Sequence, residues 1–123
     1  MRFFVRYTAP WVAYFGLISW LSHRHGGAVP LVAPLDKAAH GLEYLPLGAL
    51  LLRWRCARTR TAPSLRRVAE VVLAGLVFAA ADELHQALVP GRRADGLDVL
   101  ADAVGVLAGS LVYAAMRRRA DPN

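Results

Sequence analysis

The chain of 123 residues is long enough for one domain. Its composition is 56% hydrophobic, which exceeds the apolar share of an ordinary soluble domain. The net charge is +6, but the 15 Lys and Arg residues stand at the ends of apolar segments rather than along one polar face, so we expect no nucleic-acid partner. The single cysteine, Cys56, excludes an intrachain disulfide and a cysteine-based zinc site.

Four apolar segments, each about 15 to 20 residues long, recur along the chain. They predict helices at residues 8–22, 36–54, 68–89 and 98–116. Segments of this length and hydropathy suit a small polytopic membrane protein better than a globular core. We therefore expect one all-α domain over residues 1–123, a four-transmembrane-helix bundle that has the lipid bilayer as its first partner.

The first segment has a second interpretation, because arginines precede its apolar core as in a secretory signal peptide. Trp11, Tyr14 and Trp20 crowd that core, however, and no clear small-x-small cleavage site follows it. We favour a retained helix. Since residues 8–22 are short for a full span, the helix should also recruit residues 3–5.

The distribution of basic residues predicts the orientation of the bundle. Eleven of the 15 Lys and Arg residues fall on the side that holds the N-terminus, the connection at residues 53–67 and the C-terminus. Basic residues favour the cytoplasmic side of a membrane protein. We therefore expect a multi-pass protein of the inner (cell) membrane with both termini in the cytoplasm.

This orientation gathers most acidic residues at the outer face. Seven of the nine Asp and Glu residues fall in the outer half, against four Lys and Arg. Asp36, His40 and Glu43 are spaced i, i+4, i+7 and line one face of the second helix. Charges at membrane depth cost a few kcal/mol each, so we expect them to line one shared polar pocket that opens to the outer surface.

The third helix should supply another wall of this pocket, close to its outer end. Asp82, His85 and Gln86 share one helix face through i+3 and i+4 spacing. Glu83 is rotated about 100° away from Asp82.

The fourth helix should supply the last wall. Asp98 and Asp102 are one turn apart, and Gly105 and Gly109 continue the same face. Small residues at this spacing allow two helices to approach closely in a membrane. The acidic face of the fourth helix should therefore also be its packed face.

Residue type suggests a role for each side chain in the pocket. The groups able to move protons, and so the expected catalytic residues, are His85, Glu83, His40 and Asp82. The expected substrate-binding residues are Arg92, Lys37, Gln86, Glu43, Tyr44, Asp98 and Asp102. Arg92 is the expected anion holder, since a guanidinium is planar and multidentate for phosphate or carboxylate.

Two explanations of the pocket's charges remain open. A divalent metal is one hypothesis, and its expected ligands are Asp36, His40, Asp82 and His85. The alternative is a buried salt-bridge network in which Lys37 and Arg92 neutralise carboxylates and lock the helices together. That network predicts balanced charge, whereas carboxylates outnumber cations in the outer half.

These residues resemble the motifs of the VanZ-like family of bacterial membrane proteins. In chain order the matching motifs are Asp36-Lys37-x-x-His40, Glu43-Tyr44, Asp82-Glu83-x-His85-Gln86, Pro90-Gly91-Arg92 and Asp98-Val99-Leu100-Ala101. The resemblance extends from Asp36 to Gly109, most of the chain. Asp102 departs from it, because many members have Asn there, and a carboxylate adds charge to the site.

The resemblance implies a four-helix integral membrane protein. The namesake of the family is linked to resistance to glycopeptide antibiotics, particularly teicoplanin. The family has no well-established reaction, so the resemblance defines the family more firmly than the activity.

Three functions fit these features. The first is a hydrolase or transferase that acts on a phosphate- or acyl-linked group of a cell-envelope lipid or peptidoglycan precursor. The second is a non-catalytic envelope protein that binds a glycopeptide, a lipid headgroup or a membrane partner. The third, a proton or ion pathway, is disfavoured because the inner half has few ionisable residues. Four short helices bury little surface, so we also expect a homodimer.

Overall fold

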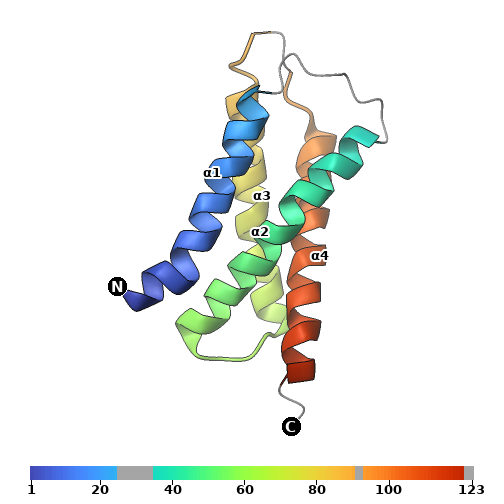
Figure 1. Ribbon diagram of the computed structural model, residues 1–123. Coiled ribbons are helices and arrows are strands. Elements are labelled where there is room, and N and C mark those ends of the chain that lie inside the picture. The colour runs from blue at the N-terminus through green and yellow to red at the C-terminus, as the bar shows by residue number, and fades with distance from the viewer. Residues whose placement is uncertain (25–34, 91–92, 121–123) are drawn as a thin grey trace.

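The computed structural model describes residues 1–24, 35–90 and 93–120. These residues form an all-α fold with the predicted four long helices. The elements, in chain order, are η1 (Phe4–Thr8), α1 (Ala9–Arg24), α2 (Leu35–Thr59), α3 (Leu65–Gln86) and α4 (Gly96–Ala120). Figure 1 shows the helices side by side, with the N-terminus, the α2–α3 connection and the end of α4 toward the lower end of the bundle.

The first helix extends back to the N-terminus, as the short apolar segment predicts. Its first turns, η1, are π-helical, and the backbone N–H of Ala9 donates to the carbonyl of Phe4, five residues earlier. Pro10 follows directly and has no N–H to donate to the carbonyl four residues before it. When a backbone hydrogen bond of the α-helix is lost in this way, the neighbouring N–H can bond to the carbonyl five residues earlier, which is the π-helical pattern.

The second helix runs past its predicted end at residue 54 and stops at Thr59. Arginine is a good helix former, and the Arg55 guanidinium pairs with Glu70 of α3 at 2.7 Å, so the basic stretch prolongs the helix. Arg60 then adopts a left-handed conformation, φ 52°. The N–H groups of Arg60 and Thr61 donate to the carbonyls of Ala57 and Cys56, which is a Schellman motif with arginine in the usual glycine position.

Helix α3 has the predicted length but starts and ends three residues earlier than the predicted range of 68–89, whereas α4 is longer than its predicted range of 98–116. Helix α3 begins at Leu65, and the side-chain oxygen of its N-cap residue Ser64 accepts from the N–H of Arg67 at 3.4 Å. Helix α4 includes three arginines in its last turn.

Helices α2 and α4 form the tightest contact of the bundle. A methyl group placed on Gly105 would overlap the carbonyl oxygen of Gly41, and one placed on Gly109 would overlap the carbonyl oxygen of Leu45. The buried Ser110 hydroxyl donates to the carbonyl of Gly48 at 3.2 Å. The predicted small-residue face of the fourth helix is therefore confirmed as a packing face against α2.

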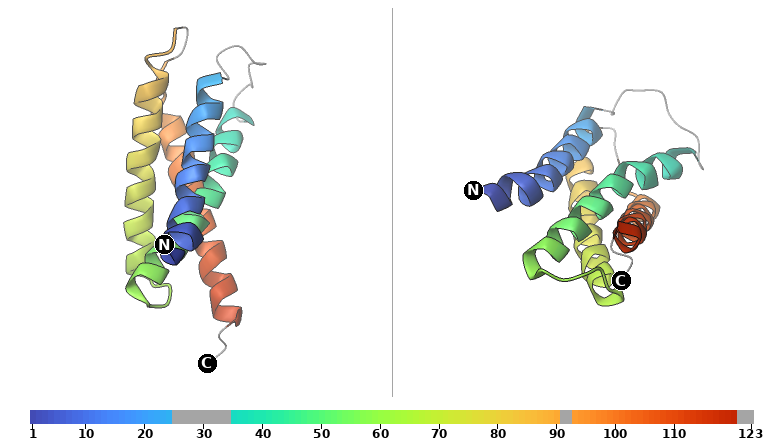
Figure 2. Two further views of the ribbon diagram at one scale, coloured as in Figure 1. Left: turned by 60° about the vertical axis from the view of Figure 1, so that its left-hand side comes forward. Right: turned by 60° about the horizontal axis from the view of Figure 1, so that its bottom comes forward.

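Helix α1 packs against α2 and α3, on the side away from α4 (Figure 2). Aromatic rings hold it there. The ring of Trp11 contacts those of Trp54 and Phe78, each with 5.9 Å between centroids, and Phe15 lies 4.8 Å from Phe78. Tyr14 donates its hydroxyl to the backbone carbonyl of Glu43 at 3.0 Å. Tyr14 and Trp11 thus serve packing, which explains why aromatic residues crowd this segment.

Among the described helices, α4 alone is both long and apolar enough to cross a membrane by length and composition. Large apolar side chains remain exposed along one of its faces. They are Leu100, Val104, Leu107 and Leu111, with 59%, 57%, 40% and 52% of their surface accessible.

Candidate functional site

Lys37 joins the first turns of α2 and α4 at one end of the bundle. Its ammonium group donates to Asp95 at 2.5 Å and to Asp98, and it lies 3.5 Å from the carboxylate of Asp36. The hydrogen bond from Lys37 lowers the pKa of the partly exposed Asp95 carboxyl below its ordinary value. One ammonium group therefore forms ion pairs with three carboxylates.

His40 lies one turn further along α2 and contacts two carboxylates of α4. Its Nδ1 is 3.1 Å from Oδ1 of Asp102, and its Nε2 is 3.6 Å from Oδ2 of Asp98. Asp102 is almost fully buried, with 2% of its surface exposed. Both ring nitrogens face carboxylates, so the imidazole is oriented from two sides.

The end of α3 brings a third set of polar side chains to this end of the bundle. The buried Gln86 side chain donates to Oδ2 of Asp82 at 3.0 Å, and Asp82 is within electrostatic range of Asp102. Glu83 accepts the backbone N–H of Asp95 at 2.9 Å through Oε2. Its other oxygen, Oε1, is buried without a hydrogen-bond partner among the described residues, as is the Tyr44 hydroxyl.

These side chains converge from three helices and the α3–α4 connection. We call the set the acidic cluster: Asp36, Lys37, His40, Asp82, Glu83, Asp95, Asp98 and Asp102. Six of its eight members are carboxylates. The convergence of acidic groups from the second, third and fourth helices is the arrangement that the helical spacing predicts.

Two expected catalytic residues of α3, Glu83 and His85, differ in their burial. Glu83 is buried, with 3% of its surface exposed, whereas His85 is exposed. The buried stripe of α3 runs through Gly75, Ala79, Asp82 and Glu83 at i, i+4, i+7 and i+8, so its centre lies between the two carboxylates. The structure therefore places Glu83 with the acidic cluster and His85 at the surface.

The group of side chains best placed for a metal also differs from the expected one. Asp36, His40 and Asp98 each offer one ligand atom, and these atoms lie within 4.8 Å of one another. The expected ligand set contained Asp82 and His85 in place of Asp98. Asp98 is the better member because the close α2–α4 contact brings it to the imidazole of His40.

Two other expected binding residues need separate mention. Glu43 is half-buried on α2, and its backbone carbonyl accepts the Tyr14 hydroxyl. Arg92, the expected anion holder, lies outside the described residues.

Asp95 is a part of the cluster to which the sequence motifs assign no role. Its Oδ1 accepts the backbone N–H of Leu97 at 2.9 Å, so it caps the start of α4, while its other oxygen faces Lys37. An aspartate directly before a helix is a recognisable N-cap signal. That signal indicates the helix start, but its pairing with Lys37, 58 residues away, appears only in the fold.

A protein-family model described as VanZ/LLP1 matches residues 3–117, and this range contains the whole acidic cluster. The chain belongs to the VanZ/LLP1 family. The resemblance seen in the motifs is thereby confirmed. VanZ/LLP1 proteins are membrane proteins, which agrees with the long apolar helix α4 of this member. No curated protein and no solved structure matches the chain.

Proposed function

We propose that all four helices of this VanZ/LLP1 protein cross the inner membrane, with both termini in the cytoplasm and the acidic cluster at the outer face. The exposed apolar stripe of α4 supports contact with lipid. A second stripe on α3 runs through Leu73, Val77 and Leu84, which are 64%, 66% and 67% exposed. Eleven of the 15 basic residues lie toward the opposite end from the cluster, as the positive-inside rule requires.

The acidic cluster is the site of the proposed activity, a hydrolase or transferase acting on a cell-envelope lipid or peptidoglycan precursor. The observation that carries this proposal is the meeting of Asp36, His40 and Asp98 within 4.8 Å, beside further carboxylates. A structural network would balance its charges. Among the described residues of the cluster, six carboxylates share Lys37 and His40, which supports a capacity for a further cation or for protons.

The donor set suits a divalent metal, because two carboxylates and one imidazole are common ligands of zinc and related ions. When bound, such an ion would activate a water molecule or polarise a phosphoryl or acyl oxygen. Asp102, on the second nitrogen of His40, would hold the ring in position.

Residues of the chain itself would transfer protons and bind the substrate. His40 is placed to accept a proton from the attacking group and to return it to the leaving group. Lys37 is placed to hold an anionic oxygen of the substrate once that oxygen displaces one of its carboxylates. Glu83 is a second candidate acid or base, since its Oε1 is buried without a hydrogen-bond partner among the described residues.

A non-catalytic role is the second candidate, and the contacts of Lys37 favour it. Its ammonium group already engages three carboxylates, which is how a locked structural network would use it. In that case the outer face would bind a glycopeptide, a lipid headgroup or a membrane partner, and no precursor would turn over.

Comparison of lipid-linked envelope precursors in deletion and wild-type cells separates these two functions. A changed precursor pool that plasmid-borne protein restores would support an enzyme. An unchanged pool together with altered teicoplanin susceptibility would support the binding role and contradict the enzyme. Metal content, measured on the purified wild-type chain and on Asp98→Asn, tests the ion separately, with Glu70→Gln at the other end of the bundle as the control.

A further inference from the structure

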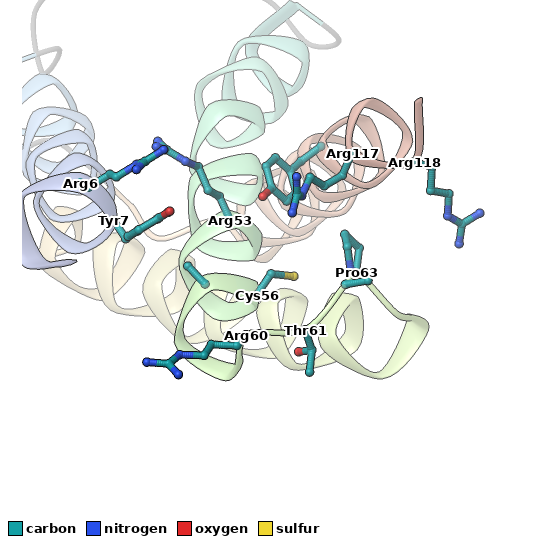
Figure 3. Close-up of a pocket in the computed structure, with 12 residues that line it drawn as sticks. Arg6, Tyr7, Arg53, Cys56, Arg60, Thr61, Pro63, Arg117 and Arg118 are labelled. Carbon is teal, nitrogen blue, oxygen red and sulfur yellow. The ribbon is translucent and has the colours of Figure 1, made fainter. Parts of the chain in front are cut away.

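A cavity of about 750 Å³ lies at the opposite end of the bundle from the acidic cluster. Its walls come from η1, the last turns of α2, the α2–α3 connection and the last turns of α4 (Figure 3). Nothing in the proposed reaction uses this cavity. Its volume falls within the range of small-molecule sites and far exceeds the space of one phosphate ion.

The charge of the cavity is one-sided. Five arginines line it, and none of its described lining residues is acidic. Glu70, which follows the α2–α3 connection on α3, pairs with Arg55 at 2.7 Å and Arg66 at 3.1 Å, and neither of these arginines lines the cavity. The arginines of the cavity therefore have no share in the ion pairs formed by Glu70.

Arg6 and Arg53 show this excess most clearly. Their guanidinium carbons lie 5.4 Å and 5.1 Å from the centroid of the same Tyr7 ring. Figure 3 shows the two guanidinium groups pointing toward one another above the tyrosine. The ring face attracts each cation, but it does not neutralise the repulsion between them. An anion between the two groups would do so.

The depth of the cavity indicates what kind of anion fits. Its inner wall includes Cys56, which is 6% exposed, and the half-buried Tyr113, while the arginines surround it. A phosphate with an attached glycerol-sized group would place its charge among the guanidinium groups and its carbon atoms against that wall. Arginine suits this task because its planar fork binds two phosphate oxygens at once.

We propose that this cavity binds the phosphate group of an anionic lipid headgroup, held chiefly by Arg6 and Arg53. The cavity lies at the end of the bundle that holds η1, the α2–α3 connection and the last turns of α4, and the proposed topology brings that end to the phosphate layer of the cytoplasmic leaflet. The binding itself depends only on the residues of the cavity. It could therefore hold even if the acidic cluster has no enzymatic function.

Lipid binding by the full-length chain in a neutral detergent tests this proposal. Native mass spectrometry would measure the dissociation constants for dioleoylphosphatidylglycerol, dioleoylphosphatidylcholine and sn-glycerol 3-phosphate. The double variant Arg6→Gln/Arg53→Gln removes two charges from the cavity. Its matched control, Arg2→Gln/Arg119→Gln, removes two exposed charges from the same end without touching the lining.

We expect the anionic lipid to bind more tightly than the zwitterionic one, and the cavity variant to weaken that binding at least about tenfold. The control should change it less than about threefold, since it alters only the general surface charge. Equal losses in the two double variants, or equal affinity for both lipids, would refute a specific phosphate site. Binding of glycerol 3-phosphate without the lipid would assign the cavity to a soluble phosphate compound.

A single variant distinguishes a specific loss of lipid binding from misfolding of the protein. Arg53→Lys keeps the charge but loses the planar fork, so it should weaken lipid binding by a smaller factor while helical content stays at the wild-type level. Wild-type affinity in Arg53→Lys together with wild-type affinity in the double variant would contradict the role of Arg53.

Discussion

The close contact between α2 and α4 positions the acidic cluster, and the substitution Gly109→Ala tests it. A Cβ atom at residue 109 would overlap the carbonyl oxygen of Leu45 and lie 3.1 Å from the backbone nitrogen of Ala49. These are backbone atoms, which cannot swing away as a flexible side chain would. The two helices must therefore separate, by about 1.5 Å if ordinary van der Waals contact is to be restored.

The loss in free energy of unfolding can be estimated from this displacement. Overpacking of this kind destabilises a protein by up to about 3 kcal/mol. Alanine has a better helix propensity than glycine, which offsets about 1 kcal/mol. We therefore expect the free energy of unfolding to fall by about 2 kcal/mol. The separation would also stretch the 3.1 Å contact between His40 and Asp102, so activity or ligand binding at the cluster should fall together with stability.

Gly16→Ala is the matched control, because a Cβ atom at residue 16 of α1 would meet no atom within 4 Å. That variant should gain up to about 1 kcal/mol from helix propensity alone. Unfolding of both variants in detergent, followed by circular dichroism, measures the difference. If Gly109→Ala is as stable as Gly16→Ala, the two helices do not pack as the structure describes.

Three further substitutions test separate contacts. Arg60→Gly should raise the free energy of unfolding by about 1 kcal/mol, because glycine adopts the left-handed conformation without strain; a loss of stability in the same denaturation assay would contradict this. Ser110→Ala should lower it by about 1 kcal/mol through loss of the hydrogen bond to the carbonyl of Gly48, and a neutral result would show that this bond contributes nothing. The third is Asp95→Asn. The lowered pKa of Asp95 means that its ion pair with Lys37 stabilises the fold above the ordinary aspartate pKa, and that this stabilisation is lost as pH falls through the lower pKa of the folded state. Unfolding between about pH 5 and pH 2 should therefore depend less on pH in the variant, and identical profiles would argue against the pair.

Helical periodicity predicts much of this fold because few residues interrupt it. The four helices and the face that carries Asp98, Asp102, Gly105 and Gly109 follow from spacing alone. The same spacing does not predict helix ends. Arg60 ends α2 in a left-handed conformation that arginine rarely adopts, so no turn residue marks the boundary in the sequence.

The acidic cluster is predicted in outline but not in its contacts. Spacing places Asp82 and Glu83 on adjacent positions, and only packing decides that the buried stripe of α3 passes between them, which turns His85 outward. The pairing of Lys37 with Asp95 joins residues 58 positions apart. Such a contact depends on how closely α2 and α4 approach, and no local signal encodes that distance.

The most direct test of the functional proposal is the pool of lipid-linked envelope precursors in cells that carry His40→Gln. Glutamine retains hydrogen bonding but can neither move a proton nor serve as an imidazole ligand. The membrane abundance of the variant must match that of the wild type. We expect wild-type protein to restore the precursor pool of deletion cells and the variant to leave it unrestored. Full restoration by His40→Gln would contradict a catalytic role for the acidic cluster.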